Sequence, residues 1–177
     1  MSENLVKKQH KDIKKFLTES KENNIIDNFL AKNLLPEEPR SGALYLTPKV
    51  HKPEKFYDTP SGNNIPQCRP IISGCGSNTE RISWFVDSHV KDSVKNLESY
   101  VEDTPDMLRF LESAESKGDL PPNAIPVALD IKSMYTNIPT DEGIDAVREE
   151  LDRREDQTIP TIFFITLLQF ILKCNVF

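Results

Sequence analysis

The segment ALYLTPKVHKP, residues 43–53, predicts a short strand with a basic end. Ala43 to Leu46 form an apolar run. Pro48 is expected to stop the strand, since proline has no N–H to donate to a neighbouring strand. Three residues that can carry positive charge follow at once: Lys49, His51 and Lys52. The strand is therefore expected to lead directly into a basic turn.

A second strand is predicted in CRPIISGCGS, residues 68–77. Ile71 and Ile72 form its apolar centre, and the two glycines Gly74 and Gly76 are expected to end it. The turn-rich segment DTPSGNNIP, residues 58–66, lies between the two strands. This arrangement predicts a hairpin whose rim carries Lys49, Lys52 and Arg69.

Helical patterns surround the hairpin on both sides. The predicted helices are residues 3–20, residues 24–35 with Ile25 and Ile26 on the apolar face, residues 78–97, a helix with Thr104 as its N-cap, a helix capped by Thr140, and an apolar helix that starts at Pro160. Between them, Ala124 to Leu129 reads as a buried strand that ends at Asp130. The order of helices, hairpin, helices, strand and helices predicts an α+β fold.

The composition suits one globular domain, or part of a larger one, because 37% of the 177 residues are hydrophobic and 28% are charged. The most apolar segment, TIFFITLLQFIL at residues 161–172, is shorter than the roughly 20 residues of a membrane-spanning helix. It is predicted to be a buried core helix, and no membrane partner is expected. Three cysteines without the spacing of a zinc site predict reduced thiols and an intracellular location, nuclear or cytoplasmic: Cys68, Cys75 and Cys174.

The net charge of −6 hides a basic region. Residues 40–81 carry six lysines and arginines against three acidic residues, whereas residues 82–177 carry nine against eighteen. Screening at physiological salt acts over about 8 to 10 Å, so a basic cleft can attract phosphate despite distant acidic residues. The acidic composition therefore does not exclude a nucleic-acid partner.

The stretch VALDIKSMYTNIPTDEG, residues 127–143, places Asp130 at the end of the predicted strand and Tyr135 five residues later. A carboxylate at a sheet edge can meet solvent and a metal ion, and Mg²⁺ prefers such oxygen ligands. Spacing alone favours plainer interpretations. By that measure Asp130 caps a turn, Tyr135 packs in the core, and the basic residues of the hairpin form a solvated face.

Taken together and in order, LYLTPKVHKP, CRPIISGCGS and VALDIKSMYTNIPTDEGI resemble the amino-terminal half of a reverse transcriptase, most closely those of Penelope-like retroelements. The resemblance covers roughly residues 44–177. It implies a helix-rich fragment of a right-hand polymerase, with a fingers hairpin and the start of the palm. The implied divisions are an amino-terminal helical extension at 1–39, a fingers-like region at 40–123 and a truncated palm at 124–177.

The resemblance also implies roles for single residues. Asp130 is similar to the first catalytic aspartate of the palm and would bind Mg²⁺ together with the carbonyl of Ile131. Tyr135 resembles the aromatic gate beneath the sugar of the incoming nucleotide. Lys49 and Arg69 resemble fingers residues that contact the triphosphate or the template, with His51 and Lys52 as further nucleic-acid contacts. The implied partners are an RNA template, a DNA primer and deoxynucleotides.

The sequence departs from this family in its later motifs. It contains no Asp-Asp dipeptide, and its last glycine is Gly143, so the second carboxylate pair and the glycine segment of the palm are missing. We therefore expect a truncated polymerase domain that does not catalyse DNA synthesis alone. Two alternatives stay open: a nucleic-acid-binding module, and an inactive remnant that exposes the palm-core residues Phe163, Phe164, Leu167 and Phe170.

Overall fold

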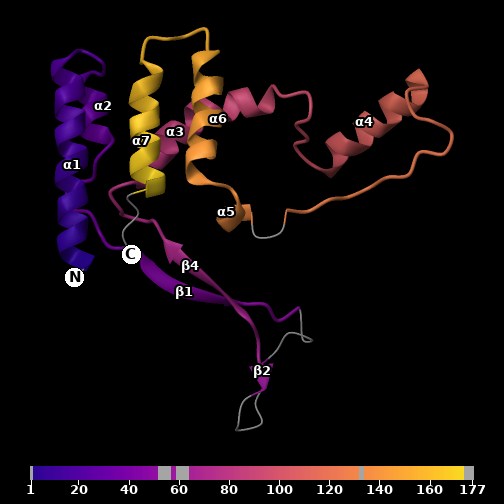
Figure 1. Cartoon of the computed structure of the whole chain (residues 1–177), viewed down its shortest axis with the longest axis horizontal. Coiled ribbons are helices and arrows are strands. Elements are labelled where there is room, and N and C mark those ends of the chain that lie inside the picture. The colour runs from indigo at the N-terminus through magenta and orange to yellow at the C-terminus, as the bar shows by residue number, and fades with distance from the viewer. Residues whose placement is uncertain (1, 52–56, 59–63, 132–133, 174–177) are drawn as a thin grey trace. The chain divides into compact units, whose positions relative to one another are not determined.

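The computed structural model describes residues 2–51, 57–58, 64–131 and 134–173 (Figure 1). The chain divides into two compact units. Unit 1 comprises residues 1–85 and 158–177, and unit 2 comprises residues 86–157. Helices and a small antiparallel sheet make up the described residues, so the predicted α+β class is confirmed.

Unit 1 contains the sheet and the helices that pack around the apolar C-terminal segment. Its elements are α1 (Ser2–Glu22), α2 (Asn28–Asn33), β1 (Ala43–Pro48), β2 (Tyr57–Asp58), β3 (Asn64–Ile65), β4 (Cys68–Ser73), the first turns of α3 (Glu80–Lys95) and α7 (Thr161–Lys173). Unit 2 contains the rest of α3, α4 (Thr104–Lys117), α5 (Met134–Asn137) and α6 (Thr140–Asp152).

The predicted hairpin is present, because β1 pairs antiparallel with β4 from Ala43 opposite Ser73 to Pro48 opposite Cys68 (Figure 1). β1 ends at Pro48, as the sequence predicts, but the missing N–H of the proline is not the reason. The backbone N–H of Lys49 donates to the carbonyl of Gln67 at 2.8 Å, so pairing continues past the proline. Since hydrogen-bonded and non-hydrogen-bonded pairs alternate along an antiparallel ladder, Pro48 occupies a non-hydrogen-bonded position, where its missing N–H costs no bond.

The core of unit 1 is aromatic and forms around α7. The ring of Phe163 lies 5.4 Å from that of Phe16 in α1, and Phe164 stacks on Phe85 of α3 at 5.5 Å. Phe163, Phe164 and Leu167 are buried, and Phe170 is half-buried. The prediction of a buried core helix is confirmed. The expectation that a remnant would expose these residues is wrong, because α1 and α3 supply the rings that cover them.

A buried amide ties α1 to the loop before α3. The side chain of Asn78 is 1% exposed, and its Nδ2 donates to the Val6 carbonyl at 3.0 Å and to Gln9 Oε1 at 3.1 Å. Its Oδ1 lies 2.9 Å from Nδ1 of His10. All of these bonds link residues about 70 positions apart in the sequence, so they hold α1 against the rest of unit 1.

The helix predicted at residues 24–35 begins later than expected. Asp27 is its N-cap and accepts a hydrogen bond from the N–H of Leu30 at 2.7 Å. Asn24 adopts a left-handed conformation with φ 57°, which ends the preceding helix. Ile25 and Ile26 therefore lie in the turn between α1 and α2. Ile26 is buried there, which accounts for its apolar character without a helix.

The helix ends of unit 2 differ slightly from the prediction. Asp103, rather than Thr104, is the N-cap of α4, and its carboxylate accepts from the N–H of Asp106 at 2.8 Å. Gly118 ends α4 at φ 76°, a conformation that glycine adopts without steric cost. Thr140 is the first residue of α6 and not its cap, because the cap position is Pro139, whose ring has no group that can accept a hydrogen bond.

The buried strand predicted at Ala124 to Leu129 is not formed, and this prediction is wrong. The segment has no regular structure, and Ile125, Val127 and Leu129 are 82%, 75% and 93% exposed. A buried strand needs a neighbour to bind its N–H and C=O groups. Among the described residues, the sheets contain β1 with β4 and β2 with β3, and neither sheet offers this segment a partner.

Candidate nucleic-acid interface

The two faces of the hairpin carry different side chains. Because successive side chains of a strand point to opposite faces, the register of β1 and β4 places Tyr45, Thr47 and Lys49 on the same face as Gln67, Arg69 and Ile71. We call this set the basic face. The opposite face carries Leu44, Leu46, Pro48, Cys68, Pro70 and Ile72, and it is apolar. The hairpin is thus amphipathic although both of its faces meet solvent.

Lys49 and Arg69 are diagonal neighbours on the basic face. Thr47 stands opposite Arg69, and Lys49 follows two residues later opposite Gln67. Diagonal positions of this kind lie about 7 to 8 Å apart, a distance that two long cationic side chains can span. Arg69 is exposed and Lys49 is half-buried. Neither forms an ion pair with another described residue.

Two tyrosines extend the basic face. Tyr45 is 52% exposed and stands opposite Ile71 in the register. Tyr57 is 59% exposed and accepts a hydrogen bond at its Oη from Nε2 of Gln67 at 3.1 Å. Exposed aromatic rings beside cationic side chains are the combination that binds single-stranded nucleic acid, since bases stack on the rings while the cations contact phosphates.

Tyr45, Tyr57 and Gln67 were not predicted from the sequence to belong to the basic face. Tyr45 could have been predicted from the sequence, because alternate residues of a strand share a face and Tyr45 is separated from Lys49 by four positions. Tyr57 and Gln67 carry no such signal. They come together only because β2 and β3 continue the hairpin and bring Tyr57 opposite Ile65, two residues before Gln67.

The other predicted contacts of the hairpin lie at its turn. His51 is exposed in the turn after β1. Lys52 falls outside the described residues. Lys49 and Arg69 are therefore the two predicted residues that the structure brings onto one surface.

The predicted palm residues belong to unit 2. Asp130 and Ile131 lie at the end of the exposed segment that follows α4, and both are exposed. Tyr135 lies in the short helix α5. Asp130 is thus on an unpaired stretch of chain and not at the edge of a sheet, which corrects the placement expected from the sequence.

The residues around Asp130 do not by themselves match the requirements of Mg²⁺. This ion takes six oxygen ligands in near-ideal octahedral geometry, commonly with one or two carboxylates, substrate phosphates and several waters. Among the described residues, no group of three or more His, Cys, Asp or Glu side chains is placed to hold a metal ion. Among the described residues, the carboxylate of Asp130 and the carbonyl of Ile131 would leave most of the coordination shell to water.

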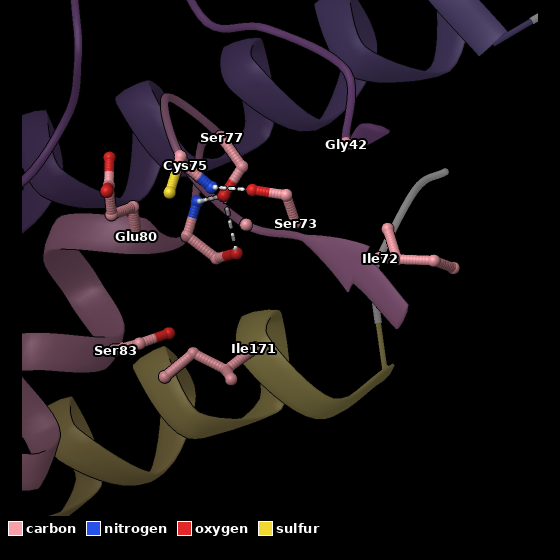
Figure 2. A pocket seen from close by; sticks show the side chains of 10 residues that line it. Gly42, Ile72, Ser73, Cys75, Ser77, Glu80, Ser83 and Ile171 are labelled. Atoms are coloured by element: carbon pink, nitrogen blue, oxygen red, sulfur yellow. Dashed lines mark hydrogen bonds between the residues drawn. The ribbon is translucent and has the colours of Figure 1, made fainter. Parts of the chain in front are cut away.

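A hollow of about 380 Å³ lies where the hairpin meets α3 and α7 in unit 1 (Figure 2). Ser73, Ser77, Glu80 and Ile171 are among its lining residues. Figure 2 shows the hydroxyls of Ser73 and Ser77 in local bonds: Ser73 Oγ accepts from the N–H of Cys75, and Ser77 Oγ accepts from the N–H of Thr79, both at 3.3 Å. None of the predicted site residues lines this hollow.

The carboxylate of Glu80 makes the hollow a poor phosphate site. It occupies the first turn of α3 and accepts a hydrogen bond from the N–H of Gly76 at 2.8 Å. A negative side chain at this position already uses the favourable field of the helix N-terminus and repels a second anion. The basic face of the hairpin is therefore the better candidate for an anionic ligand.

Comparison of the chain with protein-family models, with curated protein sequences and with solved structures gave no match. Over the described residues, the structure also holds no helix with the length and apolar character needed to cross a membrane.

Proposed function

We propose that this chain is the fingers region and first palm segment of a reverse transcriptase similar to those of Penelope-like retroelements, and that its hairpin contacts the template or the incoming nucleotide. The observation that carries the proposal is the position of Lys49 and Arg69 as diagonal neighbours on one face of the β1–β4 hairpin. Lys49 lies in LYLTPKVHKP and Arg69 in CRPIISGCGS, the two segments that resemble the fingers.

The chemistry of the basic face suits a nucleic-acid backbone. Its cationic side chains attract phosphates, and its exposed tyrosines offer stacking surfaces. Neither feature reads base identity, so binding is expected to tolerate any sequence. In a polymerase this is the required behaviour, because base pairing between template and primer supplies the specificity.

The palm residues have proposed roles only in the complete polymerase. There Asp130 and the carbonyl of Ile131 would hold Mg²⁺, which would organise the primer hydroxyl and the triphosphate for transfer. Tyr135 would lie beneath the sugar and exclude a 2′-hydroxyl by its volume. The proposal for this chain alone is binding and not catalysis, since the later palm carboxylates are missing from its sequence.

A nucleic-acid-binding module without polymerase activity is the second candidate. It is favoured by the position of Asp130, which is exposed on an unpaired segment with no described carboxylate or imidazole cluster beside it. Both candidates share the hairpin as the contact surface.

Replacing Lys49 and Arg69 together with alanine is expected to weaken binding of an RNA–DNA hybrid or a single-stranded RNA several-fold at low salt. The slope of log affinity against log salt is negative, and each lost phosphate contact reduces its magnitude by about 0.7 on a single strand. The magnitude of the slope should therefore fall by about 1.4 in the double variant. Fluorescence anisotropy between about 50 and 200 mM salt measures both quantities.

The matched control replaces one lysine and one arginine elsewhere, Lys91 and Arg109, with alanine. Both are exposed residues of unit 2. This variant changes the net charge equally but should keep the slope of the unchanged protein. Equal slopes for the hairpin variant and the control would place the contact outside the hairpin and contradict the proposal.

A further inference from the structure

A second basic surface lies on unit 1, in a groove of about 520 Å³ between α1 and α2. Lys14 and Lys21 line it from α1, and Lys32 lines it from α2. Leu17, Ala31 and Leu35 also line the groove and are buried or half-buried. We call this surface the lysine groove.

Helical spacing brings the two α1 lysines to the same side of the helix. Lys14, Thr18 and Lys21 stand at positions i, i+4 and i+7 and so project from one face. Thr18 belongs to the lining as well, although its hydroxyl is occupied by the carbonyl of Lys14 at 2.8 Å. Lys32 comes from the last turn of α2, which returns beside α1 after the turn at Asn24.

The lining of the lysine groove carries an excess of positive charge. Lys14, Lys21 and Lys32 are exposed, and none forms an ion pair with another described residue. Lys15, on the same helix but outside the groove, pairs instead with Glu19 at 3.7 Å. Glu37 is the one acidic residue of the groove lining, against three lysines and His10. Like charges held close together favour an anion that bridges them.

The groove continues toward the hairpin. A neighbouring hollow of about 440 Å³ shares His10 and Glu37 with it and reaches Ser41, two residues before β1. Along α1, the stretch from His10 to Lys21 is about 16 Å long at the usual rise of 1.5 Å per residue. This length exceeds a single phosphate group and fits several nucleotides of an extended strand.

We propose that the lysine groove binds the sugar–phosphate backbone of single-stranded nucleic acid, as a site separate from the basic face of the hairpin. A membrane surface fits less well, because an interfacial helix needs an apolar face beside its cations. Val6, Ile13 and Leu17 of α1 are buried in unit 1, and Leu5, at 49% exposure, is the exposed large apolar residue among the described residues of this helix. The proposal does not require the chain to be a polymerase fragment.

The test uses the full chain and a fluorescein-labelled single-stranded RNA of mixed sequence. Replacing Lys14, Lys21 and Lys32 with alanine should weaken binding by about tenfold at low salt and reduce the salt slope by about 2, or 0.7 for each lost contact. The matched control replaces three exposed lysines of α1 outside the groove: Lys8, Lys11 and Lys15. It removes the same charge and should change affinity less than threefold. Replacing the groove lysines with arginine should retain binding, and far-ultraviolet circular dichroism checks folding.

The outcomes separate this inference from the proposed function. A loss confined to the groove variant supports the lysine groove, whatever the Lys49 and Arg69 variant does. Equal losses of affinity in the groove and control variants would show that binding depends on net charge and not on the groove, and would overturn the inference. A loss confined to the hairpin variant would overturn it while leaving the proposed function intact. Groove-dependent binding to anionic phospholipid vesicles but not to RNA would also overturn it.

Discussion

Replacing Phe163 with alanine is expected to lower the free energy of unfolding by about 3 to 5 kcal/mol. The side chain is 1% exposed, and its ring lies 5.4 Å from Phe16, 6.1 Å from Phe164 and 6.4 Å from Phe85. Its removal leaves a cavity among three other rings and also ends the aromatic contacts, each worth about 0.5 to 1.5 kcal/mol beyond burial. Urea denaturation followed by circular dichroism measures the change.

Ile162 provides the matched control for this prediction. It precedes Phe163 in α7 but is 58% exposed, so its replacement with alanine should change stability by no more than about 0.5 kcal/mol. If both variants had equal stability, α7 would not be packed as described. The core would then not depend on contacts between α1, α3 and α7.

Replacing Asn78 with alanine is expected to lower the free energy of unfolding by about 2 to 4 kcal/mol, because it removes several buried hydrogen bonds at once. The buried amide of Asn78 donates to the Val6 carbonyl and to Gln9 Oε1, and its Oδ1 lies 2.9 Å from Nδ1 of His10, so the substitution removes three hydrogen bonds worth about 0.5 to 1.5 kcal/mol each. Loss of the amide should also loosen α1 from unit 1. Hydrogen exchange of the α1 amides measures this directly and should accelerate in the variant.

The comparison for Asn78 is Asn33, an exposed asparagine whose Nδ2 donates to the Phe29 carbonyl at 2.9 Å. Water can replace that bond, so replacing Asn33 with alanine should leave both stability and exchange nearly unchanged. Unaltered exchange of α1 in the Asn78 variant would show that the amide does not hold the helix.

Local patterns predicted the hairpin, because its strands carry short apolar runs bounded by turn residues, and each strand needs only the other as its partner. The apolar helix α7 was predictable for a similar reason, since its composition alone demands burial. The segment from Ala124 to Leu129 shows where such reasoning fails. An apolar run indicates that a strand at this position would be buried, but it does not show that a neighbouring strand exists to pair with it. Pro126 further weakens pairing, because proline has no N–H to donate.

Features that depend on tertiary contacts were not predictable from single motifs. The lysine groove requires the turn at Asn24 that returns α2 beside α1, and Lys14 and Lys32 are far apart in the sequence. Asp103 replaced Thr104 as the cap of α4 because neighbouring capping residues compete, and the sequence does not rank them. The position of Asp130 on an exposed segment follows from the missing strand and not from its own residue type.

Photo-crosslinking of the full chain to an RNA–DNA hybrid that carries 4-thiouridine, followed by mass spectrometry, tests the central claim most directly. We expect crosslinks within the hairpin between Ala43 and Ser73, foremost at Tyr45 and Tyr57. Both rings are exposed; Tyr45 shares the basic face with Lys49 and Arg69, and Tyr57 accepts a hydrogen bond from Gln67 of the same face. Crosslinks that fall elsewhere, with none between Ala43 and Ser73, would contradict it.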